Sequence, residues 1–139
     1  MTDYELISHT ADIGIRVKGK NFKALFVNAA QTMFDVVAET KTIPKSAKKE
    51  KFTVSVTATG REELFVRWLS ELISLSDAKD VHFTEFDIKD FKEQALSAGV
   101  VGFARRYFDG KREIKAVTYH ALKIEKVGEG YQAEVIFDV

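Results

Sequence analysis

Apolar side chains recur with two different periods along this 139-residue chain. In residues 13–17 and 52–58 every second residue is apolar, which is the period of a half-buried β-strand. In residues 22–37 and 64–73 the apolar positions are three or four apart, which is the period of an amphipathic helix. Residues 40–51 are a lysine-rich connector, and the chain after the second helix is again strand-like. This order predicts an α+β domain, in which two helices pack on one face of a largely antiparallel sheet.

Short local motifs mark where these elements begin and end. Thr59 and Glu62 have the spacing of a capping box, which predicts that Thr59 caps the second helix. The Asp-Gly dipeptide at 109–110 is a turn signal. Two alternating segments, 116–125 and 131–138, flank a Gly-Glu-Gly tripeptide. They predict a closing β-hairpin.

Composition narrows the class of protein. The length predicts a single domain over residues 1–139. Cysteine is absent, which excludes thiolate metal sites and cysteine nucleophiles and suits the cytoplasm. We find neither a signal-peptide pattern nor an apolar run that would span a membrane. The 21 basic and 21 acidic residues cancel, which argues against a protein that binds the nucleic acid backbone by itself.

Two aspartates far apart in sequence occupy similar positions. Asp12 precedes the first alternating segment and Asp138 ends the last one, each on the polar side of the alternation. If these segments are neighbouring strands, the two carboxylates share the helix-free face or its rim, together with the terminal carboxylate of Val139. Nearby carboxylates repel unless a cation lies between them. Oxygen ligands favour calcium, magnesium or manganese over zinc. The alternative is that both aspartates are merely solvated strand ends.

Three further residues are candidates for a supporting role. His9 lies three positions before Asp12, and His120 follows the segment that Lys115 opens. Each histidine can assist a metal site or simply hydrogen-bond a backbone carbonyl. Lys115 can pair with the carboxylates or contact a phosphate, or it can be an ordinary exposed lysine.

No motif of a nucleophilic or nucleotide-binding enzyme is present: Gly-x-Ser-x-Gly, the phosphate-binding Gly-x-x-x-x-Gly-Lys loop and His-Glu-x-x-His are all missing. Two functions other than a cation-dependent partner protein stay open. One is an RNA-binding module that uses the region from Lys45 to Lys51 and Arg105-Arg106. The other is a small metal-dependent phosphoesterase that uses Asp12, Asp138 and His120.

Four segments, in order along the chain, resemble the signatures of the archease family. They are HTADIG at 9–14, WLSEL at 68–72, KAVTYH at 115–120 and FDV at 137–139. Archeases activate the GTP-dependent tRNA-splicing RNA ligase, which joins RNA ends through a guanylylated histidine. The resemblance therefore implies an archease-like α+β fold and a non-enzymatic activator of ligase guanylylation and turnover, acting on RNA only through the ligase.

The resemblance also implies roles for particular residues. The family's divalent cation, which we expect to be calcium, with manganese or magnesium as alternatives, is held by residues that match Asp12, Asp138 and Val139. Its essential lysine matches Lys115. The chain departs from the family at Ser8, where an acid is common, and in a shortened segment at 102–112.

Overall fold

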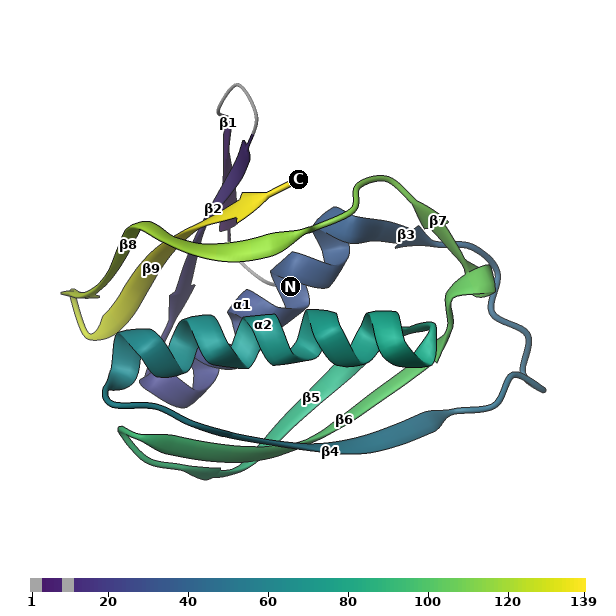
Figure 1. The fold of residues 1–139 in the computed structure, drawn as a ribbon, viewed down its shortest axis with the longest axis horizontal. Helices are drawn as coiled ribbons and strands as arrows, with labels where there is room; N and C mark the ends of the chain where they lie inside the picture. Colours follow the sequence, from purple (N-terminus) through teal and green to yellow (C-terminus); the bar gives the residue numbers. More distant parts are fainter. Residues whose placement is uncertain (1–3, 9–11) are drawn as a thin grey trace.

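The computed structural model describes residues 4–8 and 12–139 and shows two long helices among antiparallel strands (Figure 1). The helices are α1 (Phe22–Val37) and α2 (Arg61–Lys79), with a short 3-10 helix, η1 (Arg105–Tyr107). The strands are β1 (Tyr4–Ser8), β2 (Asp12–Gly19), β3 (Ala38–Thr40), β4 (Glu50–Thr57), β5 (Val81–Phe91), β6 (Ala95–Ala104), β7 (Phe108–Gly110), β8 (Ala116–Val127) and β9 (Gly130–Asp138). This arrangement confirms the predicted α+β class.

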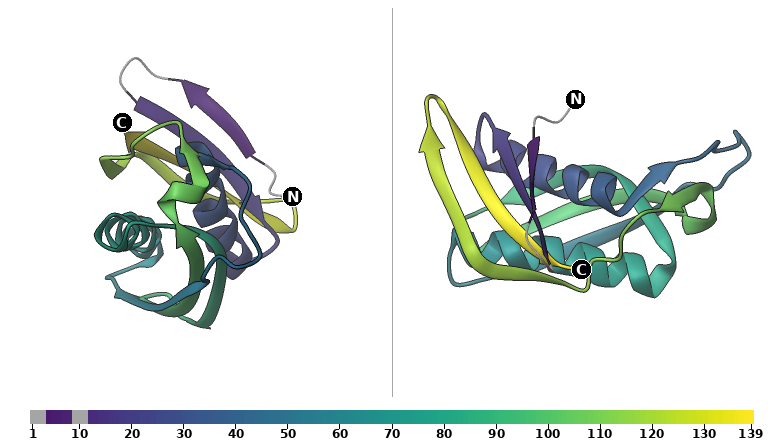
Figure 2. Two further views of the ribbon diagram at one scale, coloured as in Figure 1. Left: turned by 90° about the vertical axis from the view of Figure 1, so that its right-hand side faces the viewer. Right: turned by 90° about the horizontal axis from the view of Figure 1, so that it is seen from above.

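The strands divide among three sheets. The largest has the order β1-β2-β9-β8, the second has the order β4-β6-β5, and β3 pairs with β7. The two helices lie between the two larger sheets, as Figures 1 and 2 show. Helix α1 contacts β2 and β5, and α2 contacts β4 and β8. The helices therefore cover one face of the four-stranded sheet, and the three-stranded sheet encloses them from the other side.

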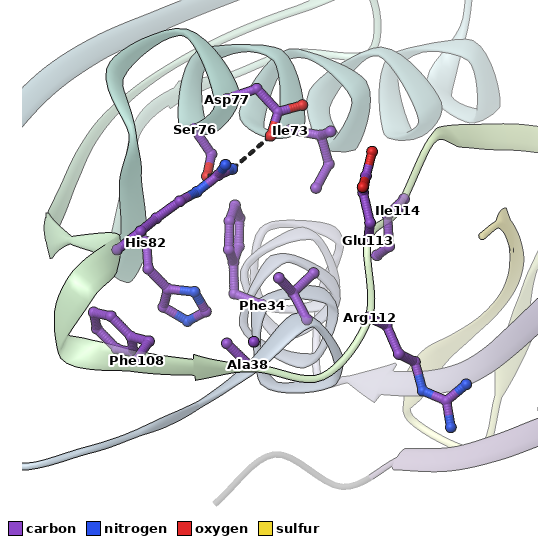
Figure 3. Close-up of a pocket in the computed structure, with 13 residues that line it drawn as sticks. Phe34, Ala38, Ile73, Ser76, Asp77, His82, Phe108, Arg112, Glu113 and Ile114 are labelled. Atoms are coloured by element: carbon purple, nitrogen blue, oxygen red, sulfur yellow. Dashed lines mark hydrogen bonds and ion pairs between the residues drawn. The ribbon is translucent and has the colours of Figure 1, made fainter.

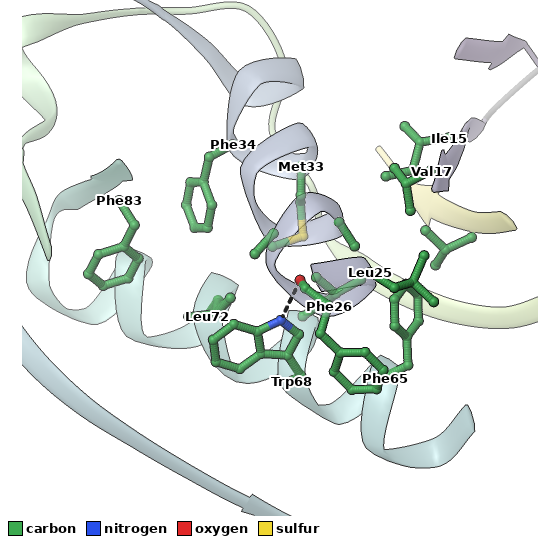
Figure 4. Close-up of a cluster of buried hydrophobic side chains, with 14 of the residues drawn as sticks. Ile15, Val17, Leu25, Phe26, Met33, Phe34, Phe65, Trp68, Leu72 and Phe83 are labelled. Atoms are coloured by element: carbon green, nitrogen blue, oxygen red, sulfur yellow. Dashed lines mark hydrogen bonds between the residues drawn. The ribbon is translucent and has the colours of Figure 1, made fainter. Parts of the chain in front are cut away.

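The core fixes the four-stranded sheet against both helices (Figure 4). Ile15 and Val17 of β2 are fully buried, as is Trp68 of α2. The indole Nε1 of Trp68 donates a hydrogen bond to the carbonyl oxygen of Phe26 in α1 at 3.0 Å, so the two helices are joined by a polar contact inside an apolar core. A buried indole N–H needs such a partner. This packing holds β2 and its neighbour β9 in a fixed register.

Two of the local predictions are wrong. Helix α2 is capped by Gly60, which has no side chain to donate or accept, and the backbone N–H of Thr59 donates to the Glu63 carboxylate at 2.9 Å. The helix begins one residue later than the capping-box spacing indicated. The Asp-Gly pair at 109–110 lies in β7, where pairing with β3 overrides the turn preference of these residues.

The predicted closing hairpin is confirmed. Strands β8 and β9 pair antiparallel and are joined at Gly128, whose φ of 61° is in the left-handed region that glycine adopts without strain. Strand β9 also pairs with β2, so the first and last predicted strands are neighbours. No helix in the described part of the chain is long and apolar enough to cross a membrane.

Candidate functional site

Asp12 and Asp138 face each other across two neighbouring strands. Asp12 is the first residue of β2, Asp138 is the last residue of β9, and the antiparallel register pairs them directly. Directly opposed residues project from the same face of a sheet, with Cβ atoms about 4.5–5.5 Å apart. Their neighbours Ile13 and Phe137 are buried on the helix-covered face. Packing of these apolar side chains therefore directs both aspartates to the helix-free face.

The same face carries a second cross-strand pair of charged residues, four positions along each strand. Arg16 of β2 is paired in register with Glu134 of β9, and the Arg16 Nε donates to Glu134 Oε1 at 2.7 Å. This pair consists of opposite charges. By contrast, no ion pair or hydrogen bond to the Asp12 or Asp138 carboxylate is formed by any of the described residues. The ladder thus ends in two like charges, which repel when they are directly opposed.

Strand β8 brings the backbone of Lys115 to the end of the sheet where Asp12 and Asp138 lie. We call this end of the sheet the acidic rim. Ala116, the first residue of β8, is paired with Asp138, and the backbone N–H of Lys115 donates to the Asp138 carbonyl oxygen at 2.7 Å. The Lys115 side chain is exposed. Within the described ranges, no contact between its amino group and either aspartate is present. The structure thus places the three residues together by backbone, and the role of the lysine stays a prediction.

The remaining predicted site residues are less fully described. Val139 follows Asp138 directly, and its side chain packs against the hydrophobic core. This packing holds the last backbone unit of the chain at the same rim. His9 lies outside the described residues. His120 belongs to β8 by its backbone, and its side chain is outside the described part.

The oxygen donors at this rim are of the kind that a hard cation binds, but they are too few to fill its coordination sphere. Its groups are carboxylate oxygens, which calcium, magnesium and manganese prefer. Among the described side chains, which do not include those of His9 and His120, no group of three histidine, aspartate or glutamate residues is close enough to hold an ion. Calcium takes about six to eight oxygen ligands. Two aspartates and the Val139 carboxylate would hold it only with further oxygens, from water, backbone carbonyls or a partner.

Some of the basic residues that suggested RNA binding interact with acidic or aromatic residues of the same chain. Lys49 lies 3.6 Å from the Glu85 carboxylate, and Arg105 pairs with Asp77 at 2.5 Å. The Arg106 guanidinium lies over the ring of Tyr107, 4.7 Å from its centroid. Lys45 and Lys48 are exposed. This distribution leaves a weaker basic surface than the sequence indicated.

Sequence reasoning did not find the contrast between the two cross-strand pairs. The alternation of apolar and polar residues does place Arg16 and Glu134 on the polar side of their strands, as it does Asp12 and Asp138. However, which residue opposes which depends on the register of β2 against β9. A one-residue slip would move every side chain to the other face.

The fold and the facing acidic residues define a small α+β protein with a carboxylate-lined rim on one sheet. The family model of the Archease protein family matches residues 4–139. A protein archease of Methanosarcina barkeri is 36% identical over 98% of this chain and 95% of its own length, and one from Sulfurisphaera tokodaii is 32% identical over the full length of both chains. The chain belongs to the archease family.

Solved structures support the same fold. The solution structure of a Methanobacterium thermoautotrophicum protein matches with a TM-score of 0.72 and 26% identity, and covers 98% of both chains. A Thermotoga maritima crystal structure, described as an archease and possible chaperone, matches with a TM-score of 0.67 and 24% identity over 97% of this chain and 96% of its own. Neither the family's name nor these descriptions carries an enzymatic activity.

Proposed function

We propose that this protein is a non-enzymatic activator of a GTP-dependent tRNA-splicing RNA ligase, and that it promotes the guanylylation and repeated turnover of that ligase. Membership in the archease family supports the proposal. The observation that carries it is the directly opposed pair of Asp12 and Asp138, with the backbone of Lys115 bonded to Asp138. This rim concentrates charge at an exposed edge, where a partner can reach it.

The rim would hold one divalent cation through Asp12, Asp138 and the terminal carboxylate of Val139, with calcium as the expected ion and manganese or magnesium as alternatives. A bound cation supplies positive charge that offsets the repulsion between the two carboxylates. The aspartates would orient the ion, and the packing of the Val139 side chain against the core would keep the last carboxylate near them. Lys115 adds a cation at the end of the adjacent strand, where it can meet a phosphate or carboxylate of the ligase complex.

Three other functions have less support. The partial pairing of the basic residues and the zero net charge disfavour a stand-alone RNA-binding module. A phosphoesterase that uses Asp12, Asp138 and His120 has no nucleophile motif in the sequence to support it. A chaperone for unfolded chains needs an exposed apolar surface. The described residues expose two large apolar side chains, Tyr119 and Val127.

A ligation assay tests the proposal. The cognate ligase is given RNA with a 3′-phosphate or cyclic phosphate end and a 5′-hydroxyl end, with and without this protein, under multiple-turnover conditions. We expect faster ligation and faster incorporation of label from GTP into the ligase when the protein is present. Equal rates in both reactions would contradict the proposal. The pure protein should neither ligate, cleave nor dephosphorylate the RNA.

The terminal carboxylate is tested by the position of an affinity tag. A carboxy-terminal tag converts the Val139 carboxylate into an amide and should weaken cation binding, as measured by calorimetric titration with calcium and manganese. An amino-terminal tag is the matched control and should be tolerated. Equal cation affinity of both tagged forms would remove Val139 from the proposed site.

A further inference from the structure

A pocket lies at the carboxy-terminal ends of both long helices. The pocket has a volume of about 400 Å³, within the range of roughly 300–1,000 Å³ that is usual for ligand sites. Residues from α1, α2, β5, η1 and β7 and from the segment before β8 line it. The lining residues on which the argument rests are Phe34, Ile73, His82, Arg105, Phe108 and Ile114. We refer to this region as the His82 pocket.

His82 is a buried polar residue whose side chain forms no hydrogen bond with the described residues. Its relative exposure is 6%, its ring stacks on Phe108 at a centroid distance of 4.1 Å, and it meets Phe34 edge-on at 5.3 Å. Figure 3 shows the imidazole directed into the pocket between these two rings. No described residue makes a hydrogen bond to its ring nitrogens. The ring nitrogens therefore face the pocket, where they can bond a polar atom of a ligand.

The charge state of His82 makes it a polar recognition group rather than a second cation. Burial and, to a smaller extent, the nearby Arg105 guanidinium together lower the pKa of His82 to about 4. The ring is therefore neutral at neutral pH and offers one N–H donor and one nitrogen acceptor. The other charged groups that line the pocket are Asp77 of α2 and, before β8, Arg112 and Glu113.

Arg105 supplies unused donors beside this imidazole. One terminal nitrogen of its guanidinium donates to Asp77 Oδ1 at 2.5 Å and to Ser76 Oγ at 2.9 Å. A guanidinium has five N–H groups in a planar fork that fits a carboxylate or phosphate. Its other N–H groups have no partner among the described residues. Asp77 also lines the pocket, but 59% of its side chain is exposed, so water screens the charge of its carboxylate.

We propose that the His82 pocket binds a small molecule that combines a planar or apolar ring with one anionic group, either a carboxylate or a phosphate. The ring would lie among Phe34, Ile73 and Ile114, which supply apolar walls. The anionic group would accept hydrogen bonds from Arg105, and the edge of His82 would bond a polar atom of the ligand. The pocket adjoins the acidic rim along the chain, because Ile114 precedes Lys115.

The test separates the two parts of such a ligand. Phenyl phosphate and phenylacetate carry a ring and an anion, benzyl alcohol carries the ring alone, and inorganic phosphate and acetate carry the anion alone. Each is titrated into the full-length protein while NMR follows the imidazole nitrogens of His82 and the methyl groups of Ile114. We expect at least one of the two combined probes to bind at least about tenfold more tightly than benzyl alcohol or its matching anion, a difference of about 1.4 kcal/mol. The binding of that probe should raise the pKa of His82, because its anion offsets the charge of Arg105.

Adjacent arginines provide the matched control. Arg105→Gln should weaken the binding of the combined probes at least about tenfold and leave the binding of benzyl alcohol unchanged. Arg106→Gln changes the next residue of η1, which does not line the pocket, and should change neither. Thermal melting of both variants checks the fold.

The outcome also shows which chemical class of anion the pocket prefers. Tighter binding of phenyl phosphate would assign the pocket to phosphate esters, and tighter binding of phenylacetate would assign it to carboxylic acids. The proposal is wrong if the combined probes bind no better than their separate parts. It is also wrong if the two arginine variants behave alike, or if no probe moves the signals of His82 and Ile114.

Discussion

Two cross-strand pairs on the same face of β2 and β9 differ in how their charge is balanced. Arg16 and Glu134 are opposed and bonded to each other, whereas Asp12 and Asp138, four residues along each strand, are opposed and carry the same charge. The backbone pairing is the same at both positions. The difference therefore lies in the side chains alone, which makes one pair a natural control for the other.

The two pairs differ in what they contribute to stability: the Arg16–Glu134 pair stabilises the fold, whereas the Asp12–Asp138 pair does not. The Arg16–Glu134 pair is one-third exposed on each side, and such pairs contribute up to about 1 kcal/mol to stability. Folding gains nothing from two opposed aspartates, because like charges in this position destabilise a sheet. We attribute Asp12 and Asp138 to function for this reason, and the following predictions test that attribution.

The largest expected effect concerns divalent cations. Under the proposed function calcium binds the folded state only, so calcium at about 100 times its dissociation constant should stabilise the native protein by about 2.7 kcal/mol. Asp138→Asn removes one charge with little change of shape and should lower calcium affinity at least about tenfold. Calorimetric titration measures the affinity, and chemical denaturation with calcium or a chelator measures the stability.

Glu134→Gln is the matched control for that experiment. It makes the same chemical change on the same strand and face, four residues from Asp138. Calcium affinity should stay within about twofold of the native value, a difference of about 0.4 kcal/mol. A loss of affinity as large as that of Asp138→Asn would mean that the whole face, rather than its acidic end, attracts the ion.

The next effect is the cost of converting the balanced pair into a repulsive one. Glu134→Lys places a cation opposite Arg16 on β2 and Lys123 on β8. Loss of the ion pair and the new repulsion should together destabilise the protein by about 1–2 kcal/mol. Urea denaturation at low salt should show this loss, and high salt should reduce it, because exposed charges are screened. A variant as stable as the native protein would show that charge balance on this face is energetically unimportant.

The sequence predicted the elements of this face better than their pairing. Strict alternation identified β2 and β9, because Ile13, Ile15 and Phe137 must reach the core. It also placed Asp12 and Asp138 on the outer face. Alternation carries no information about which residues are opposed, since register depends on the packing of both strands against α1.

The short strands and the His82 pocket could not be predicted from the sequence. Strands β3 and β7 have three residues each, too few to show a period, and the turn preference of Asp-Gly was misleading at 109–110. His82 had no distinctive setting in sequence. Its environment comes from Phe34, Phe108 and Arg105, which lie far from it along the chain. Such contacts follow from tertiary packing and not from local patterns.

A smaller effect of opposite sign is expected at the acidic end. Asp138→Lys converts the like-charged pair into an attractive one with Asp12, so the metal-free protein should gain about 0.5 kcal/mol. The same substitution should abolish the calcium-dependent gain in stability. Denaturation in the presence of a chelator measures the first effect, and the addition of calcium measures the second. Destabilisation in chelator would show that Asp12 and Asp138 do not repel each other in the native protein.

The smallest effect on stability is predicted for Lys115→Ala. The Lys115 side chain is exposed and precedes β8, so its removal opens no cavity, and its bond to Asp138 uses only the backbone N–H. The free energy of unfolding should stay within about 0.5 kcal/mol of the native value. Under the proposed function, activation of the ligase should nevertheless fall, because the rim would lose the positive charge that we propose to meet phosphate or carboxylate groups of the complex. Lys126→Ala, at the opposite end of β8, is an equally exposed control and should activate normally. Multiple-turnover ligation and thermal melting of both variants decide the matter: if Lys115→Ala melts and activates like the native protein, Lys115 is an ordinary surface lysine, and the rim acts through its carboxylates alone.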